Sequence, residues 1–322
     1  MKNWHPNARV YEINTWVWLN TLSQRYGKTI TLETIPDEII AELASYHVDV
    51  IWMMGVWYHS KAVRDSALNY VHEYRGALPD ITDDDVKGSA YAIGKYDVDA
   101  RIGGRAGLEH FRERLQAHGL KLILDFVPNH VSTDHPIIAT HPEYFVQGTE
   151  EMIAHEPGNF FRTKNAQGDD MIIAHGRDPY FSGWIDTAQF NAFNQGYRDA
   201  AVEVLLKIAA LSDGVRCDMA MLMLNSIFDR TWGWTELESP DEDFWLYVIP
   251  EVLEQYPNFV FIAETYWHMD YQLQQQGFDF TYDKVGYDRL LDGNINGLYD
   301  HLNADINFVR RNIRFIENHD EQ

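Results

Sequence analysis

LKLILDFVPNHVS, residues 120–132, is a short apolar run that ends in polar side chains. Residues 122–124 are apolar on both faces, which is typical of a parallel strand covered on both sides. Asp125, Asn129 and His130 follow at the carboxyl end, where parallel α/β folds place their sites. The segment therefore predicts a buried strand with a polar site at its end.

Three later stretches also end an apolar run with polar or charged side chains. They are GVRCD at residues 214–218, FVFIAE at residues 259–264 and IRFIENHD at residues 313–320. Because the carboxyl ends of parallel strands meet at one edge of a sheet, we expect these polar ends to lie close together.

Apolar spacing predicts seven strands connected mainly by helices. One helix begins at Pro36, a second ends at Gly119, and a third covers residues 197–211. Residues 58–105 are rich in glycine and are expected to form loops. Besides the opening segment, the expected strands are residues 10–18, 48–56, 213–219, 259–263, 278–282 and 313–316.

The third and fourth predicted strands are unusually far apart. Asp125 and Asp218 are separated by 93 positions, more than twice the usual length of one β-loop-α unit. The intervening chain is polar, aromatic and interrupted by proline and glycine. We therefore predict a small subdomain at residues 131–191, inserted into a main domain formed by residues 1–130 and 192–322.

This βα alternation predicts an α/β fold, a TIM (β/α)8 barrel, because helical crossovers connect parallel strands and closure removes exposed edges. Only seven strands are found before Gln322, so the barrel is expected to be truncated after strand 7. A fragment of a longer protein and an open seven-stranded sheet both explain this, and the fragment is the expectation.

Composition narrows the possible partners and location. The chain has 322 residues, with 26 Lys and Arg against 49 Asp and Glu, giving a net charge of −23. Such a charge repels nucleic acid and anionic membranes, so a neutral substrate is expected. The single cysteine, Cys217, and the absence of an apolar leader at the amino terminus indicate a cytoplasmic protein. Oligomeric state is not indicated.

The polar strand ends supply three carboxylates with different surroundings. Strand alternation places Arg216 and Asp218 on one face and Cys217 on the other, so Cys217 is expected in the core. The guanidinium favours ionised Asp218, whereas the apolar run before Glu264 favours its protonated form. A nucleophile beside an acid, with Asp320 as a third carboxylate, is typical of retaining glycoside cleavage.

Single residues of this kind also have purely structural explanations. An Asp at a strand end often caps a helix. His130 and His319 stand near carboxylates, but no His-x-His or His-Glu-x-x-His spacing accompanies them, so sugar hydrogen bonding is favoured over metal binding. Tyr91 and Trp267 are candidates for stacking on a sugar, although packing explains an aromatic at a barrel mouth equally well.

The four ordered segments, DFVPNH, GVRCD, IAET and NHD, resemble the signature segments of the α-amylase family of glycoside hydrolases. The resemblance spans about residues 10–322. It implies a (β/α)8 barrel with a subdomain after the third strand, and a retaining mechanism on α-glucosidic bonds. It further implies Asp218 as nucleophile, Glu264 as general acid/base and Asp320 as stabiliser of the transition state.

The same resemblance implies a set of sugar-binding residues. Arg216, His130 and His319 would bind the sugar at the cleavage site, and Asp125 would orient Arg216. Tyr91, in AYAIGKY, is similar to the tyrosine with which the family stacks on that sugar.

Departures from the family pattern favour some members over others. Met221 and Leu222 occupy the positions of a Lys-His pair found in many α-amylases, which argues against the family's calcium ion, so no cofactor is expected. Ala92 stands where exo-α-glucosidases have an Asp. At this position the sequence resembles sucrose-acting glucosyltransferases instead. The eighth strand and the carboxyl-terminal β-sandwich of the family have no counterpart in this sequence.

Two other classes of function remain open. A transglycosylase or sucrose-type glucosyltransferase would use the same carboxylates, with an acceptor sugar in place of water. A non-catalytic carbohydrate-binding homologue is the second alternative, although all three carboxylates are present.

Overall fold

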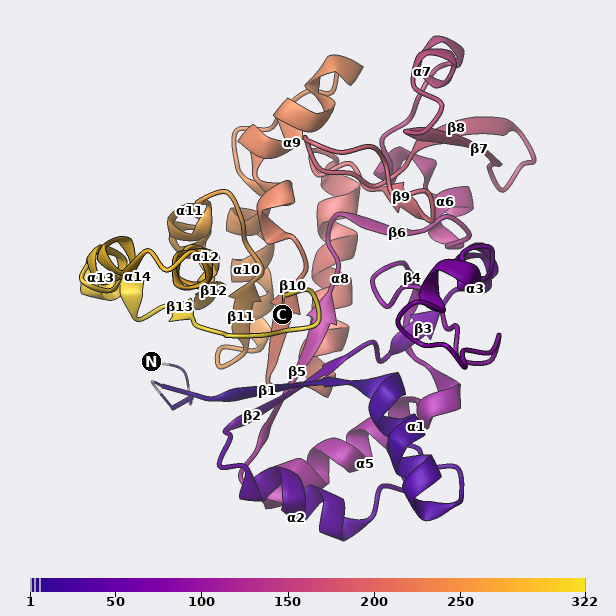
Figure 1. Ribbon diagram of the computed structural model, residues 1–322. Helices are drawn as coiled ribbons and strands as arrows, with labels where there is room; N and C mark the ends of the chain where they lie inside the picture. The colour runs from indigo at the N-terminus through magenta and orange to yellow at the C-terminus, as the bar shows by residue number, and fades with distance from the viewer. Residues whose placement is uncertain (1, 3, 6, 322) are drawn as a thin grey trace.

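Seven parallel strands form one sheet in the computed structural model, which describes residues 2, 4, 5 and 7–321 (Figure 1). Their order across the sheet is their order along the chain, which is the topology of a TIM barrel up to its seventh strand, as predicted. The strands are β1 (Val10–Asn14), β2 (Val50–Met54), β5 (Lys121–Phe126), β10 (Gly214–Cys217), β11 (Val260–Ala263), β12 (Phe280–Tyr282) and β13 (Asn312–Ile313).

Alternation along these strands divides the apolar core between two faces of the sheet. Trp52, Ile123 and Ile262 belong to a small cluster on the inner face. Cys217 belongs to the large cluster between the sheet and its helices and is fully buried, as the sequence predicted. Because successive side chains of a strand point to opposite faces, the neighbours of Cys217 point inward.

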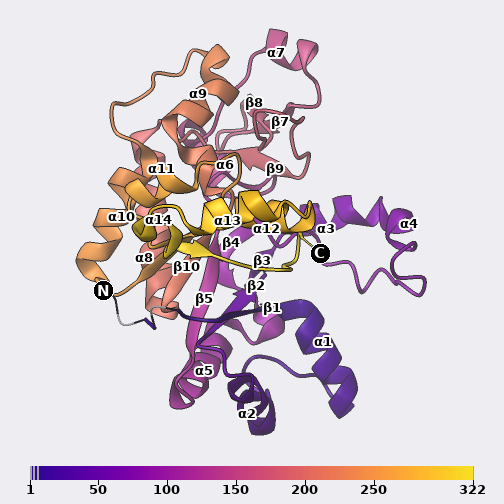
Figure 2. The ribbon, with the colours of Figure 1, turned by 60° about the vertical axis from the view of Figure 1, so that its left-hand side comes forward.

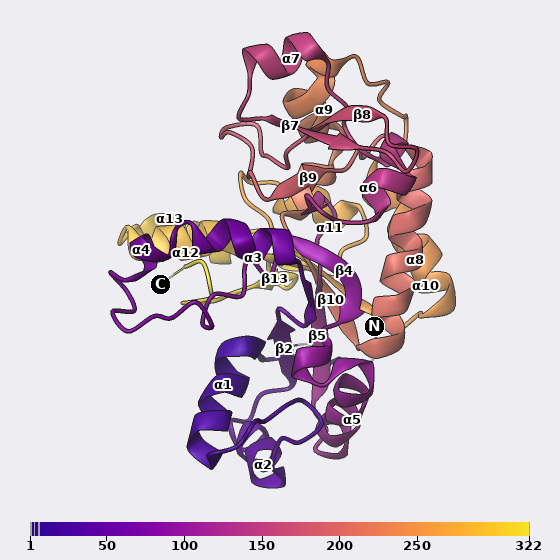
Figure 3. The same cartoon turned by 90° about the vertical axis from the view of Figure 1, so that its right-hand side faces the viewer.

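Helices cover the outer face of the sheet (Figures 1 and 3). In the longer helices, buried apolar residues recur at helical spacing, so each of these packs one stripe against the rest of the fold. The helix predicted to end at Gly119 ends two residues earlier, at Ala117, and Gly119 follows it in the left-handed region at φ +76°. The helices are α1 (Thr15–Tyr26), α2 (Asp37–Ser45), α5 (Gly104–Ala117), α8 (Gln195–Leu211), α10 (Phe244–Gln255), α11 (Asp270–Gln275), α12 (Lys284–Leu291), α13 (Ile295–Leu302) and α14 (Ile306–Val309).

The sheet has two edges, at β1 and β13, and no pairing between described residues joins them. A cavity of about 460 Å³ lies on the inner face and is lined by residues of both edge strands. Residues 314–321 follow β13 and return toward β1 (Figure 2). Within the described part of the chain, none of the helices has the length and apolarity needed to cross a membrane.

The predicted first strand, residues 10–18, is too long because a helix begins inside it. β1 ends at Asn14, whose side-chain oxygen accepts a hydrogen bond from the backbone N–H of Val17 at 3.3 Å. An Asn that satisfies a free N–H in this way favours the start of a helix. The β-branched and aromatic residues after Asn14 suggested a strand, but the cap determines the local structure.

Residues 58–105 were expected to be mainly loop, and they contain more regular structure than that. β3 (Trp57–His59) pairs antiparallel with β4 (Ile93–Val98). Gly94, taken as a loop residue, lies within β4, where a Cβ atom would come within 2.9 Å of the Tyr58 ring. The glycine therefore allows close approach of two segments. Three short helices complete the region: α3 (Lys61–Leu68), α4 (Val71–Tyr74) and η1 (Ala100–Ile102).

The chain between β5 and α8 forms a separate group of short elements at the carboxyl end of the sheet (Figure 3). β6 (His130–Ser132) pairs antiparallel with β9 (Thr187–Gln189), and β7 (Phe160–Lys164) with β8 (Asp170–Ala174). The short helices of this segment are α6 (Ile137–Thr140), η2 (Pro142–Tyr144) and α7 (Glu150–His155). After β10, the chain forms η3 (Ala220–Met223), α9 (Asn225–Trp232) and η4 (Gly233–Thr235).

Candidate active site

Arg216 lies at the centre of a buried group of carboxylates. Its Nη1 donates a hydrogen bond to Asp218 Oδ1 at 2.7 Å. Its Nη2 lies 2.8 Å from Glu264 Oε2, an ion pair outside hydrogen-bond geometry. Asp125 Oδ1 lies 3.5 Å from Nη1. One guanidinium thus holds three of the predicted site residues together.

Strand register brings these residues side by side. Arg216 pairs with Asp125 of β5 on one side and with Ile262 of β11 on the other. Glu264 stands two positions after Ile262, so both side chains point to the inner face. Its backbone N–H donates to the Cys217 carbonyl at 3.0 Å, which carries the ladder to the end of the strand.

Glu264 is bound on both carboxyl oxygens. The Met219 backbone N–H donates to Oε2 at 2.6 Å, and the Tyr266 hydroxyl donates to Oε1 at 3.0 Å. Burial raises the pKa of Glu264 to about 7, against the opposing effect of Arg216. At neutral pH this carboxyl is therefore poised to exchange a proton.

Burial also raises the pKa values of the two Asp carboxyls beside Arg216. The pKa of Asp125 rises to about 7, although Arg216 lowers it and Trp52 Nε1 donates to Oδ2 at 3.2 Å. The pKa of Asp218 rises as well, against the charge and hydrogen bond of Arg216. Three carboxyls share one guanidinium, so full ionisation of all three is disfavoured, and Asp218 has the shortest charge-assisted hydrogen bond to Arg216.

His319 and Asp320 lie at the edge of the group. His319 Nδ1 is 2.6 Å from Glu12 Oε1, and its Nε2 is 2.9 Å from the Tyr91 hydroxyl and 3.2 Å from Asp320 Oδ2. The hydrogen bond to His319 lowers the pKa of Asp320, whose side chain is 55% exposed. Asp320 therefore differs from Glu264: it is open to solvent and ionised.

Aromatic rings enclose the guanidinium on several sides. The Arg216 Cζ atom lies 5.3 Å from the ring centre of Trp52, 5.1 Å from that of Tyr91 and 5.8 Å from that of Tyr282. Tyr91 also stacks on His319, with ring centres 5.3 Å apart. These contacts hold the cation in a fixed place.

His130 lies beside Tyr91. Its ring forms a backbone hydrogen bond with Tyr91 and packs against Trp184, with ring centres 5.2 Å apart. Burial lowers the pKa of His130 to about 4, so the imidazole is neutral at physiological pH. A neutral imidazole can both donate and accept hydrogen bonds to sugar hydroxyls.

Asn129 is buried and hydrogen-bonded to the inserted segment. Asn129 Oδ1 accepts a hydrogen bond from Gln189 Nε2 at 2.8 Å. Met221 and Leu222 are buried and offer no side-chain oxygen. Among the described residues, no three His, Cys, Asp or Glu side chains are grouped so as to hold a metal ion.

Four contributors to the site were missed from the sequence: Glu12, Trp52, Tyr266 and Tyr282. Alternation alone places Glu12 and Trp52 on the inner face, since they are directly paired across β1 and β2. Tyr282 is the last residue of β12, and its hydroxyl accepts a hydrogen bond from Arg216 Nε at 3.3 Å. Tyr266 lies in a loop, where no periodicity exists to reveal it.

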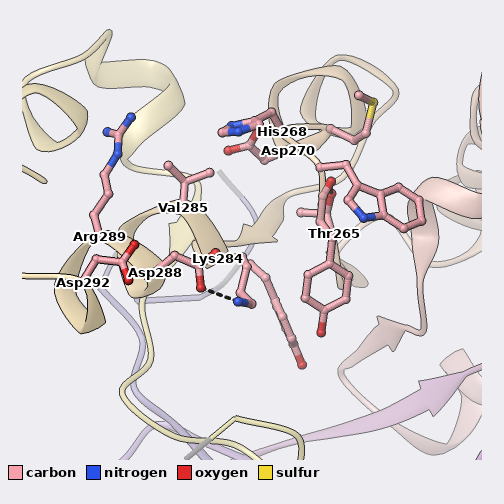
Figure 4. A pocket seen from close by; sticks show the side chains of 12 residues that line it. Thr265, His268, Asp270, Lys284, Val285, Asp288, Arg289 and Asp292 are labelled. Carbon is pink, nitrogen blue, oxygen red and sulfur yellow. Dashed lines mark hydrogen bonds and ion pairs between the residues drawn. The ribbon is translucent and has the colours of Figure 1, made fainter. Parts of the chain in front are cut away.

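A second cavity, of about 210 Å³, is lined by the loop that follows β11 and by α12 (Figure 4). The loop after β11 forms one wall, with Thr265, His268 and Asp270, and α12 forms the other, with Lys284 and Asp288 joined by an ion pair. Polar groups of both charges therefore face this space.

Comparisons with known proteins agree with the geometry. No family model matches the sequence. Alpha-amylase MalA of Haloarcula japonica is 25% identical over 259 residues, which are 78% of this chain and 32% of that protein. The fold matches an α-amylase from Lactobacillus plantarum, with a TM-score of 0.64 at 19% identity over 98% of this chain and 64% of that one.

Two further solved structures share the fold. A noncanonic maltogenic α-amylase, AmyB from Thermotoga neapolitana, has a TM-score of 0.61 at 20% identity, covering 98% of this chain and 60% of that one. Cyclic α-maltosyl-(1→6)-maltose hydrolase from Arthrobacter globiformis has a TM-score of 0.60 at 17% identity, covering 97% and 66%.

The ordered motifs, the strand order and the relative from H. japonica point to the same conclusion. In sequence and in fold this chain is similar to α-amylases, which agrees with the resemblance of the four segments. It spans about a third of the length of the curated relative and under two thirds of the length of the first two structures.

Proposed function

We propose that the protein is a retaining glycosidase that acts on α-glucosidic bonds of neutral oligo- or polysaccharides. The observation that carries this proposal is the bridge formed by Arg216 between Asp218 and Glu264. One planar cation bound to both carboxyls keeps them close, and a short separation, about 5 Å, is what a double-displacement mechanism needs. A wider gap would be needed to admit water between them for inversion.

In the first step, Asp218 attacks the anomeric carbon. Arg216 opposes the rise in the pKa of Asp218 that burial causes, and its hydrogen bond orients the carboxylate for this attack. Glu264 gives its proton to the glycosidic oxygen, which leaves with the electron pair of the broken bond. Asp320, exposed and ionised, stabilises the positive charge that develops on the sugar ring.

In the second step, Glu264 is a base. It removes a proton from the incoming hydroxyl, whose oxygen displaces Asp218 from the anomeric carbon. Tyr91, His130 and His319 are proposed to bind the sugar, and Asp125 to hold Arg216. A cytoplasmic setting belongs to the same proposal, because the one cysteine is buried and unpaired.

Transfer to an acceptor sugar is a second candidate activity. Ala92 follows Tyr91 and is fully buried, so this position offers no carboxylate to a terminal sugar. This favours a transglycosylase or sucrose-type glucosyltransferase over an exo-α-glucosidase. Product analysis with and without added maltose distinguishes the two activities, since only a transferase lengthens the acceptor.

Stereochemistry tests the proposed reaction. Proton NMR of the anomeric signals, recorded in the first minutes of turnover of an α-glucoside, should detect the α-anomer or a new α-bond first. Two inversions at Asp218 require it. A β-anomer as first product would rule out the double displacement. A chain that binds the sugar without turnover would be the non-catalytic homologue.

A further inference from the structure

The two carboxyl oxygens of Glu264 have unlike surroundings. Oε2 faces the Met219 backbone N–H at 2.6 Å and Arg216 Nη2 at 2.8 Å. Neither an amide N–H nor a guanidinium has an acceptor to offer. A proton on Oε2 would therefore point at a donor and a cation, so the proton of the neutral acid belongs on Oε1.

Oε1 is bound by a group of a different kind. The Tyr266 hydroxyl lies 3.0 Å from it and can either donate or accept. It donates to the carboxylate, and after rotation about its C–O bond it accepts from the neutral acid. Burial and the nearby charge of Glu264 raise the pKa of Tyr266 far above its ordinary value, so the hydroxyl keeps its own proton.

We propose that Tyr266 is a positioning residue whose hydroxyl holds the exchangeable proton of Glu264 on Oε1 and stabilises the carboxylate once that proton has gone. This inference rests on the acid/base role proposed for Glu264. The proton passes from Oε1 to the leaving oxygen, which takes the electrons of the broken C–O bond. The Tyr266 hydroxyl then rotates to donate to the new carboxylate and transfers no proton itself.

Backbone strain on both sides of Glu264 is an independent observation. Met219, which supplies the N–H to Oε2, has φ +41°. Trp267 and His268, directly after Tyr266, have φ +57° and +61°. Left-handed backbone at residues other than glycine costs energy, and surrounding contacts must impose it. The backbone N–H of Met219 and the hydroxyl of Tyr266, which both hydrogen-bond to Glu264, thus belong to or adjoin strained turns.

Packing and a backbone hydrogen bond hold the strained turn at Trp267 and His268 in place. The Trp267 ring meets Tyr180 of the inserted segment edge-on, with ring centres 4.9 Å apart. The Met269 backbone N–H donates to the Tyr266 carbonyl at 3.1 Å. The same turn forms a wall of the cavity of about 210 Å³ (Figure 4).

The charged and titratable groups that surround Glu264 and Tyr266 determine the effect of removing the Tyr266 hydroxyl. Arg216, Asp218 and Tyr266 act on Glu264, and Asp320 and Arg216 act on Tyr266. Tyr266→Phe removes a donor that favours the charged carboxylate, so the pKa of Glu264 should rise. Arg216 and Asp218 stay in place in this variant.

The test compares Tyr266→Phe with the unaltered protein by two measurements. The first is the pH profile of kcat/KM on a maltooligosaccharide, whose alkaline limb should move to higher pH by about half a unit or more while kcat falls about tenfold. The second is a titration of ¹³C-labelled Glu carboxyl signals, with Glu264 assigned through Glu264→Gln. Tyr271→Phe, an exposed tyrosine of α11, is the matched control and should change neither.

The two measurements separate this inference from the proposed function. An unchanged titration of Glu264 in Tyr266→Phe overturns the role of Tyr266, whatever the activity. A merely structural role would lower kcat and leave both the alkaline limb and the Glu264 titration where they were, which also overturns it. If Glu264 titrates as expected but turnover does not follow that titration, the positioning holds and the acid/base assignment fails.

Discussion

Nδ1 of His319 lies 2.6 Å from Oε1 of Glu12, so an ion pair connects residues 307 positions apart. Burial lowers the pKa of His319, but hydrogen bonds from its ring to Asp320 and Glu12 outweigh this and raise it to about 10. The pair thus attaches the segment after β13 to β1, at the two edges of the sheet.

A pH-dependent contribution to stability follows from this pair. The folded pKa of His319 is raised above its unfolded value near 6.5, so its stabilising effect is complete below pH 6.5 and is lost as pH rises through about 10. Glu12→Gln should therefore lower the free energy of unfolding by about 1–2 kcal/mol at pH 6 and by much less at pH 10.5. Urea unfolding at both pH values measures this.

Glu113→Gln is the control for that experiment, because Glu113 is exposed on α5. It should change stability little at either pH. An equal loss at pH 6 and pH 10.5 in Glu12→Gln would mean that the pair contributes packing and not charge.

The second prediction concerns Asp218. Asp218→Asn keeps the shape of the side chain and removes the proposed nucleophile, so turnover should fall at least about a thousandfold. Binding of the sugar should persist, because Arg216, Tyr91 and His319 remain. Initial rates and calorimetric titration with a maltooligosaccharide measure the two effects.

Asp300→Asn is the matched control, since this Asp is exposed on α13, away from Arg216. Its rate should equal that of the unaltered protein. A variant at Asp218 that kept more than a few per cent of the rate would remove it from the role of nucleophile.

The third prediction separates the acid from the stabiliser. Glu264→Gln should lose much more activity on a substrate with a sugar leaving group than on an α-glucosyl fluoride, because fluoride departs without protonation. Azide should rescue the second step and give an α-glucosyl azide. If Asp320→Asn behaves in this way and Glu264→Gln does not, the two roles are exchanged.

Much of this arrangement was predictable because it follows from strand periodicity. Arg216 and Asp218 share a face by alternation, and parallel register then adds Asp125 and Glu264. What alternation cannot reveal lies in loops and caps. Tyr266 reaches Glu264 through a strained turn, and β1 ends early because Asn14 caps α1.

Effects of residues distant in the sequence on pKa values could not be predicted either. The apolar run before Glu264 correctly suggested a raised pKa, but nothing near Asp125 in the sequence indicates that its pKa rises to about 7 by burial. The partners of His319 come from β1 and from the region of β4, which only the folded chain brings together.

The most direct test of the central claim is to trap the covalent intermediate on Asp218. A 5-fluoro-α-glucosyl fluoride slows the second step more than the first, so the glycosyl-enzyme accumulates and can be digested and sequenced by mass spectrometry. The account predicts one added fluoroglucosyl group, on the peptide containing Asp218 and on that residue. Modification of Glu264 or Asp320 instead, or turnover of this reagent with no adduct and release of the β-anomer, would contradict it.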